Sequence, residues 1–140
     1  MNFIIIMDCL FCKIVNKEVP AEVIYEDDFV LAFLDIQPRT LGHTLVIPKK
    51  HRESLIELED KEIEQFFSGL KNVTLLLKQK LSANGFNIGV NQGKVAGQVI
   101  SHLHFHILPR FENDNGSSIQ AIVNNPPQLS LKEVKKKILG

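Results

Sequence analysis

The segment 101–110 reads SHLHFHILPR, with a histidine at every second position three times in succession. Successive side chains of a β-strand point to opposite faces, so this alternation predicts a strand with one imidazole face and one apolar face. A shift of one residue in its pairing would bury the imidazoles, so the pattern also fixes the register. The imidazole face carries His102, His104 and His106, and the apolar face carries Leu103, Phe105 and Ile107.

Neighbouring imidazoles on one strand face are separated by about 7 Å, so two of them can reach one phosphate group or one metal ion. The simplest interpretation is a polar sheet face whose histidines have no chemical role. A second is a metal site, because the His-x-His spacing lets two imidazoles bind one ion. A third is covalent catalysis, since an imidazole is largely unprotonated near neutral pH and is nucleophilic when its other ring nitrogen is held as a donor.

The rest of the chain predicts an α+β domain with a mainly antiparallel, five-stranded sheet, one long helix and one or two short helices. Apolar patterning and turn residues predict strands at 22–25, 29–36, 43–47 and 86–90, in addition to the histidine strand. The strand at 29–36 is apolar at nearly every position, so we expect both of its faces to be covered. Short helices are predicted at 9–17 and after the capping box Ser130-Leu131-Lys132-Glu133.

The long helix is predicted from about residue 60 to residue 82. Asp60 is expected to cap its start, and Asn84-Gly85 is expected to end it. Its apolar residues follow the three-four spacing of one buried stripe. They are Ile63, Phe66, Phe67, Leu70, Val73, Leu76, Leu77 and Leu81.

Composition narrows the class of protein. The chain has 140 residues, 16 basic and 16 acidic side chains, and no net charge, so no global field favours nucleic acid as a partner. No apolar run has the length that a bilayer requires, and the N-terminus lacks the basic region of a signal peptide. We therefore expect a cytoplasmic protein without a membrane partner, for which Met7 is an alternative start to Met1.

The chain has two cysteines, Cys9 and Cys12, which form a single C-x-x-C motif. A structural disulfide is not expected in a reducing compartment. Metal binding, a redox pair and two inert thiols remain as interpretations of the motif.

Several segments together resemble the histidine-triad (HIT) family of nucleotide hydrolases and transferases, in its zinc-binding bacterial-type branch. The segment 102–108, HLHFHIL, resembles the triad signature itself. CLFCKIVNKEVPAEVIYEDDFVLAFLDIQPRTLGHTLVIPKKH, at 9–51, resembles the family's N-terminal half, and FNIGVNQG and AGQVISHLHFHILPR resemble its C-terminal half. The resemblance implies one HIT-like domain over residues 1–140, with a core at about 9–110 and a loop and C-terminal helix at 111–140.

The resemblance implies a catalytic role for three histidines. His104, the middle histidine, would attack the α-phosphorus of a nucleotide and form a nucleotidyl-histidine intermediate. His106 would hydrogen-bond the phosphate oxygens or the bridging atom, and His43 matches an additional histidine of the family's site. Val99 stands where family members often have a serine near the scissile bond, so the handling of the leaving group can differ in this chain.

The resemblance also implies a nucleotide site. Asp35 would accept hydrogen bonds from the ribose hydroxyls. An apolar slot for the base would be lined by Leu10, Phe11, Ile14, Phe33 and Ile36, and a loop that holds the phosphate would contain Asn91, Gly97, Gln98 and Val99.

A subset of the family binds a structural zinc ion, and its ligand positions correspond to Cys9, Cys12, His51 and His102. Two thiolates and two imidazoles make a closed tetrahedral site with no place for a substrate water. No catalytic metal is expected. The zinc would hold the N-terminal helix beside the histidine strand.

The expected enzyme cleaves purine nucleoside phosphoramidates or dinucleoside polyphosphates at the α-phosphate and releases a nucleoside monophosphate. Two alternatives remain at this point, namely a nucleotide-binding regulatory module with little turnover and a metallohydrolase that uses the triad as ligands. The resemblance further implies a homodimer in which two sheets join into one.

Overall fold

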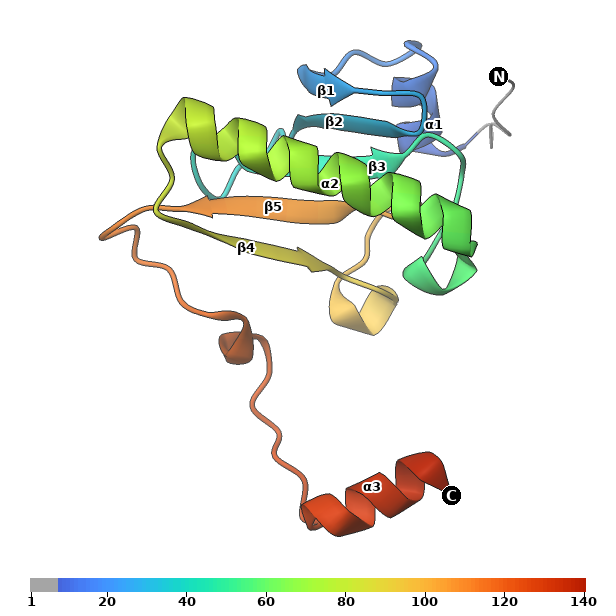
Figure 1. Cartoon of the computed structure of the whole chain (residues 1–140), viewed down its shortest axis with the longest axis vertical. Helices are drawn as coiled ribbons and strands as arrows, with labels where there is room; N and C mark the ends of the chain where they lie inside the picture. The colour runs from blue at the N-terminus through green and yellow to red at the C-terminus, as the bar shows by residue number, and fades with distance from the viewer. Residues whose placement is uncertain (1–7) are drawn as a thin grey trace.

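The computed structural model describes residues 8–140, which form one antiparallel sheet with a long helix lying across it (Figure 1). The strands are β1 (Val23–Glu26), β2 (Val30–Leu34), β3 (Thr44–Pro48), β4 (Gly85–Val90) and β5 (Phe105–Arg110). Their order is β1-β2-β3-β5-β4, and every neighbouring pair is antiparallel. The predicted α+β class and five-stranded sheet are therefore confirmed. The choice between Met1 and Met7 as the start lies outside the described residues.

Three α-helices accompany the sheet: α1 (Leu10–Val15), α2 (Asp60–Leu81) and α3 (Leu131–Leu139). Short 3₁₀ turns occupy Leu55–Glu57 (η1), Lys94–Ala96 (η2) and Ile119–Ile122 (η3). Within the described part of the chain, none of the helices has both the length and the apolar character needed to cross a bilayer.

The span of α2 agrees with the prediction, but the residues that cap it differ. Glu59, not Asp60, caps the helix, because Glu59 and Glu62 form a reciprocal capping box in which Glu59 N donates to Glu62 Oε2 at 3.2 Å. The helix ends at Ser82, whose φ of 54° lies in the left-handed region, two residues before Asn84. Glu59 thus takes the capping position that the sequence predicts for the neighbouring Asp60.

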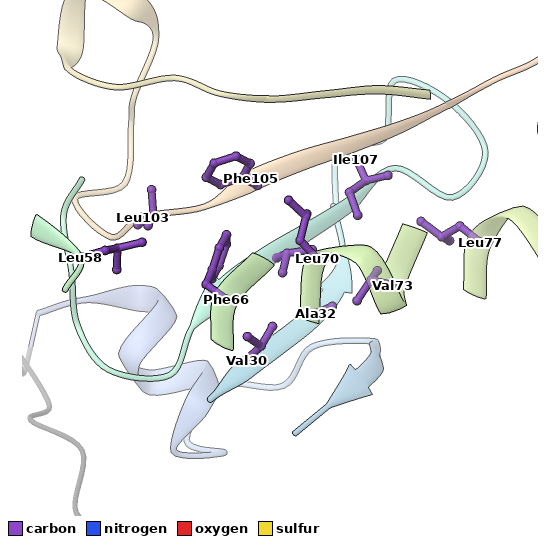
Figure 2. Close-up of a cluster of buried hydrophobic side chains, with 11 residues drawn as sticks. Val30, Ala32, Leu58, Phe66, Leu70, Val73, Leu77, Leu103, Phe105 and Ile107 are labelled. Carbon is purple, nitrogen blue, oxygen red and sulfur yellow. The ribbon is translucent and has the colours of Figure 1, made fainter. Parts of the chain in front are cut away.

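One side of α2 packs on the sheet and forms the first core (Figure 2). Phe66, Leu70, Val73 and Leu77 are buried there, as the three-four spacing predicts. Ile63 and Phe67 were expected in the same stripe but are 37% and 42% exposed, because they lie at its rim. The sheet contributes Val30, Ala32, Val46, Phe105 and Ile107. Truncating a core aromatic such as Phe66 to alanine would cost about 3–5 kcal/mol.

The opposite face of the sheet carries a second core. Alternate residues of β2 and β3 point there, and the short helix α1 covers them, so both faces of β2 are buried as predicted. The cluster consists of Leu31, Phe33, Leu45 and Ile47 from the sheet with Cys9, Phe11, Cys12 and Ile14 from the region of α1.

The histidine strand is shorter than the alternation suggests. β5 begins at Phe105, so of the three histidines only His106 lies within the paired strand, opposite Leu45 of β3 and Gly89 of β4. His102 and His104 lie in the extended segment before it, where the backbone N–H of Leu103 donates to the carbonyl of Arg52. The alternation is nevertheless kept, because Leu103, Phe105 and Ile107 all belong to the first core.

After β5 the chain leaves the sheet as an arm of residues 111–140, with α3 standing apart from the other elements (Figure 1). Ser130 and Glu133 form the predicted capping box at the start of α3. No residue of α3 is buried.

Candidate metal centre and candidate active site

Two thiols and two imidazoles from distant parts of the chain meet beside α1. Cys9 caps the helix, and its Sγ accepts the backbone N–H of Cys12 at 3.4 Å. His51 follows β3 and His102 precedes β5, so the fold brings their rings to the same place. One potential ligand atom of each residue lies within 4.8 Å of all the others. The structure therefore brings together the four residues that the sequence predicts as metal ligands.

The distances within this cluster fit a tetrahedral ion. Sγ of Cys9 lies 3.3 Å from Nδ1 of His102, and Sγ of Cys12 lies 3.3 Å from Nδ1 of His51 and 3.6 Å from Nδ1 of His102. Zinc bonds of about 2.3 Å to sulfur and about 2.0–2.1 Å to nitrogen imply a sulfur–nitrogen edge of about 3.6 Å. The donor set is therefore close to the size that zinc requires.

The backbone orients His102 toward the sulfurs. Its Nε2 lies 2.8 Å from the carbonyl oxygen of Pro48. A carbonyl only accepts, so Nε2 carries the hydrogen and the lone pair of Nδ1 faces the thiols. Burial lowers the pKa of His102 to about 4, so the ring is neutral at pH 7 and ready to act as a ligand.

An ion pair fixes the segment that carries His51. Nε and Nη2 of Arg52 donate to the two carboxylate oxygens of Glu62 at 3.0 and 2.6 Å. The hydrogen bonds from Arg52 lower the pKa of Glu62 to about 2. The first turn of α2 is thus tied to the residue next to His51.

His104 has a defined tautomer. Its Nδ1 lies 2.7 Å from the carbonyl oxygen of His102, so Nδ1 must carry the hydrogen. Nε2 is therefore the unprotonated nitrogen of the neutral ring. The ring is buried and packs edge-on against Phe11, with 5.1 Å between centroids, which limits its rotation. This is the state that a nucleophilic imidazole requires.

A second hydrogen-bonded chain orients His106. The backbone N–H of Arg39 donates to Nδ1 of His43 at 3.1 Å, so Nε2 of neutral His43 carries the hydrogen. That nitrogen lies 2.9 Å from Nδ1 of His106 and 3.5 Å from Oδ2 of Asp35. Donation to His106 leaves the hydrogen of His106 on its own Nε2. The rings of His104 and His106 have centroids 5.2 Å apart, so an imidazole with a free Nε2 and an imidazole with an Nε2–H lie side by side.

Both members of this chain are neutral at pH 7. Burial lowers the pKa of His43 against the opposing effect of Asp35. Burial lowers the pKa of His106 to about 4, and the neighbouring His104 and His43 add to the effect. A neutral imidazole can donate one hydrogen bond and accept another, which is the pattern that this chain of contacts requires.

The residues expected around the base fall into two groups. Phe11, Ile14 and Phe33 are buried in the second core, whereas Leu10 is 41% and Ile36 is 94% exposed. Of the five side chains, only Leu10 and Ile36 therefore present substantial surface to solvent.

Asp35 lies at the edge of this apolar region. Its Oδ1 accepts the backbone N–H of Gln37 at 2.8 Å, and its Oδ2 faces His43.

The loop after β4 is built around Gln98. Its Oε1 accepts the backbone N–H of Gly93 at 2.9 Å, and its Nε2 donates to the carbonyls of Glu53 and Ile100 at 2.9 and 3.1 Å. Gln98 therefore shapes the loop through its side chain. Gly97 has a φ of 99°, which favours glycine, and its Cα lies beside the side chain of Asn91. Val99 is 87% exposed.

The structure adds residues that the sequence analysis did not single out. His43 and His106 also line a cavity. Its other lining residues include Arg39, Asn87, Gly89, Leu108, Ile119 and Ile122. The alternation of β4 was a usable signal, because it places Asn87 and Gly89 on the face opposite Phe86 and Ile88. No sequence pattern indicated that the arm, residues 111–140, would contribute Ile119 and Ile122 to this cavity.

Comparison with known proteins identifies the family of this chain. The sequence profile of the HIT domain family matches residues 16–113. The chain belongs to the HIT domain family. A HIT-like protein of Methanocaldococcus jannaschii, itself uncharacterised, is 52% identical over 132 residues, covering 94% of this chain and 99% of the relative. An adenosine 5′-monophosphoramidase of Schizosaccharomyces pombe is 37% identical over 113 residues, covering 81% of this chain and 82% of the relative.

Solved HIT structures share the fold. A HIT family member from Bacillus subtilis superposes with a TM-score of 0.82 at 34% identity, covering 94% of this chain and 92% of the other. A zinc-bound histidine triad protein from Mycobacterium smegmatis superposes with a TM-score of 0.74 at 40% identity, covering 79% of this chain and 81% of the other. A zinc-binding HIT protein is therefore among the structural relatives of this chain.

Proposed function

We propose that this HIT protein hydrolyses nucleotides at the α-phosphorus through a covalent nucleotidyl-His104 intermediate. The observation that carries the proposal is the hydrogen bond from Nδ1 of His104 to the carbonyl of His102, which leaves Nε2 as the nucleophile. The similarity to an adenosine 5′-monophosphoramidase supports a purine nucleoside phosphoramidate as substrate, with dinucleoside polyphosphates as the second class.

In the first step, Nε2 of His104 attacks the α-phosphorus and forms a phosphorus–nitrogen bond. The bond from phosphorus to the leaving atom breaks, and its electron pair departs with the leaving group, which takes a proton from solvent. Nε2–H of His106 donates to the oxygens of the transferring phosphoryl group and stabilises the charge that develops there. His43 acts through His106, whose tautomer it fixes.

In the second step, water attacks the same phosphorus and releases a proton to solvent. The phosphorus–nitrogen bond breaks, its electron pair returns to Nε2 of His104, and a nucleoside monophosphate leaves. Neutral His104 is regenerated because Nδ1 keeps its hydrogen bond to His102 throughout.

The nucleotide would be held beside this row of histidines. The exposed Leu10 and Ile36 would contact an apolar base, together with any accessible edge of Phe11, Ile14 and Phe33. The carboxylate of Asp35 is suited to the ribose diol, and the turn at Gly97, Gln98 and Val99 together with Asn91 is suited to the phosphate.

We further propose that Cys9, Cys12, His51 and His102 hold a structural zinc ion. Zinc would link α1 to the segments before β5 and after β3 and would supply no catalytic chemistry, because all four positions are filled by the protein. A reducing compartment such as the cytoplasm would keep both thiols available to the metal.

A homodimer is the third part of the proposal. β4 is an edge strand that pairs only with β5 in the described chain, and Ile88 on it is 39% exposed. Two β4 edges could pair and join two sheets into one. Sedimentation velocity should give a dimer for the wild-type chain and a monomer for Ile88→Lys, and a monomeric wild type would refute this part.

The intermediate is tested by intact-protein mass spectrometry of acid-quenched mixtures with adenosine 5′-phosphoramidate. We expect an adenylyl adduct in the wild type, mapped to His104 by peptide analysis, and none in His104→Ala. Nucleotide affinity of His104→Ala should stay within about tenfold, because a nucleophile acts mainly in the transition state.

The same experiment separates the alternatives. Tight nucleotide binding with neither adduct nor turnover would favour a regulatory binding module. Turnover that persists in His104→Ala would exclude His104 as the nucleophile.

A further inference from the structure

The two cysteines of the proposed zinc site are arranged so that they could also bond to each other. Cys9 is the N-cap residue of α1, and Cys12 lies in the first turn of the helix. The backbone N–H of Cys12 donates to Sγ of Cys9 at 3.4 Å, which turns the side chain of Cys9 toward the helix. The two sulfur atoms lie within 4.8 Å of each other. In thiol–disulfide oxidoreductases, a C-x-x-C pair alternates between two thiols and one disulfide.

Both thiols are free, and the chain has no other cysteine. A disulfide within one chain can therefore join only this pair. The two residues are buried to different degrees, since the exposed fraction is 8% for Cys9 and 2% for Cys12. A small oxidant from solvent therefore meets the sulfur of Cys9 first, because access limits the reactivity of buried thiols. Cys12 is placed to react second, from inside the cluster.

The two imidazoles of the cluster are supported unequally. Nε2 of His102 lies 2.8 Å from the carbonyl oxygen of Pro48, so this ring is anchored on the side away from the sulfurs. Nε2 of His51 is buried and has no hydrogen-bond partner among residues 8–140. A ligating imidazole normally donates its second ring N–H, and loss of that partner weakens metal binding about 10- to 100-fold. His51 is therefore the weakly supported ligand, and its Nδ1 lies 3.3 Å from Sγ of Cys12, which a disulfide would withdraw.

We propose that Cys9 and Cys12 form a reversible oxidation site, at which a hydroperoxide converts the two thiolates to a disulfide and expels the zinc ion. The inference rests on the zinc part of the proposed function. Because the thiolate is the metal-binding form of cysteine, a disulfide removes two of the four ligands at once. Two imidazoles remain, and they do not complete the four-coordinate shell of a structural zinc ion.

The oxidation proceeds in two steps. Sγ of Cys9 attacks one oxygen of the hydroperoxide, the oxygen–oxygen bond breaks, and the leaving alkoxide or hydroxide takes a proton from solvent, so that Cys9 becomes a sulfenic acid. Sγ of Cys12 then attacks Sγ of Cys9. The sulfur–sulfur bond forms, the sulfur–oxygen bond breaks, and the departing hydroxide takes a second proton and leaves as water. The two sulfurs thus give two electrons to the peroxide, and a dithiol returns them.

Oxidation at this site would reach the proposed nucleophile through α1. The helix carries Phe11, whose ring packs edge-on against His104 with 5.1 Å between centroids. In the loaded site, zinc would tie the start of α1 to the segments that carry His51 and His102. A disulfide within the start of α1 provides no such tie, so the position of Phe11 against His104 is less restrained. We therefore expect the oxidised protein to turn over slowly and to recover on reduction.

The site is tested on the full chain, purified with zinc under reducing conditions and then titrated with hydrogen peroxide. A chromogenic chelator measures released zinc, and alkylation followed by intact-protein mass spectrometry counts thiols. We expect one zinc ion to be released for each disulfide formed, and turnover of adenosine 5′-phosphoramidate to fall at least about tenfold. Dithiothreitol with zinc should restore metal content and rate. Thiols that stay reduced, zinc that stays bound when the disulfide forms, or oxidation that dithiothreitol does not reverse would overturn the inference.

The order of the two thiols is tested by a matched pair of variants and dimedone, which traps sulfenic acids. Cys12→Ser lacks the second thiol, so an adduct should accumulate at Cys9, whereas Cys9→Ser should give several-fold less adduct at the more deeply buried Cys12. Circular dichroism checks that both variants are folded, and the wild-type titration decides the inference if either is not. Equal adducts in the two folded variants would overturn the assignment of Cys9 as the thiol attacked first.

These measurements separate the oxidation site from the proposed function. Zinc release and thiol content do not require turnover, so a zinc-loaded chain that hydrolyses no nucleotide would refute the proposed catalysis, while the titration still decides the oxidation site. A reduced, folded chain that binds no zinc would refute the zinc part of the proposed function and this inference with it.

Discussion

The carbonyl oxygen of His102 lies 2.7 Å from Nδ1 of His104, so a candidate metal ligand and the candidate nucleophile share one hydrogen bond. The side chain of His102 faces the thiols of Cys9 and Cys12, while its backbone fixes the tautomer of the ring two residues later. A change in the cluster that moves the backbone of His102 would therefore reach the ring of His104 through a single peptide unit.

Metal removal should affect both stability and the nucleophile. We expect Cys9→Ser, or chelation of the wild type, to lower the melting temperature strongly, because the binding energy of a structural metal contributes to folding. In protein that circular dichroism shows to be folded, ¹⁵N spectra should show His104 losing its fixed Nδ1–H tautomer. Asp8→Ser, next to the cluster, is the control. Unchanged metal content and melting temperature in Cys9→Ser would contradict the zinc assignment.

His43→Ala should reduce kcat by about 10²- to 10³-fold, the range for a lost donor at a reacting group, and should change the affinity for AMP only slightly. The reason is positional: without Nε2–H of His43, the hydrogen of His106 is no longer confined to Nε2. ¹⁵N shifts of the His106 ring report this directly, and His43→Gln, which keeps a donor, should recover part of the rate. A higher KM with normal kcat would instead indicate a substrate-binding role.

Acid should destabilise the protein partly through His106. Its pKa is about 4 in the folded state, against 6.5 as the ordinary value, so the unfolded chain binds more protons between these values. Stability from His106 is therefore complete above pH 6.5 and is lost as the pH falls toward 4. Thermal melts at pH 7 and pH 4.5 should show a smaller acid-induced loss for His106→Gln than for the wild type. An equal loss of stability in the wild type and in His106→Gln would argue against a lowered pKa of His106.

The close approach of α2 to the sheet predicts an unusual glycine effect. Alanine normally stabilises a helix interior by about 1 kcal/mol relative to glycine. At Gly69, however, an added Cβ would lie 2.8 Å from Cγ2 of Val30, a buried side chain of β2. Gly69→Ala should therefore lower the free energy of unfolding, measured by urea denaturation, whereas the exposed Ser68→Ala should not. A stabilised Gly69→Ala would mean that the helix shifts freely on the sheet.

The elements with strong periodicity were predictable from the sequence. The spacing of Phe66, Leu70, Val73 and Leu77 located α2, and the alternation at Leu103, Phe105 and Ile107 located the apolar face of the histidine segment. The cap at Glu59 was missed because Glu59 and the adjacent Asp60 are both possible N-cap residues. Glu62 forms the capping box with Glu59, and the local sequence does not decide between the two candidates.

Only the identity of the site residues was predictable from the sequence. The sequence, through its resemblance to a family, named the four cluster residues and the three histidines. The directions of the hydrogen bonds could not be predicted, because they depend on backbone groups from distant segments, such as Pro48 for His102 and Arg39 for His43. The cavity beside His43 and His106 was missed for the same reason, since part of its wall comes from the arm, which Arg110 and Asp114 hold by a hydrogen bond.

The spacing of the candidate metal ligands along the chain would set when an ion can be bound during biosynthesis. Cys9 and His102 are 93 positions apart, so the ribosome completes the ligand set only after β1 to β4 and α2 have been made. Ion capture by the complete set would close a loop that runs from Cys9 to His102 and would restrict the disordered chain accordingly. The four-ligand site would thus bind its ion only in a polypeptide whose synthesis has passed His102. A product truncated before His102 would lack one of the four ligands.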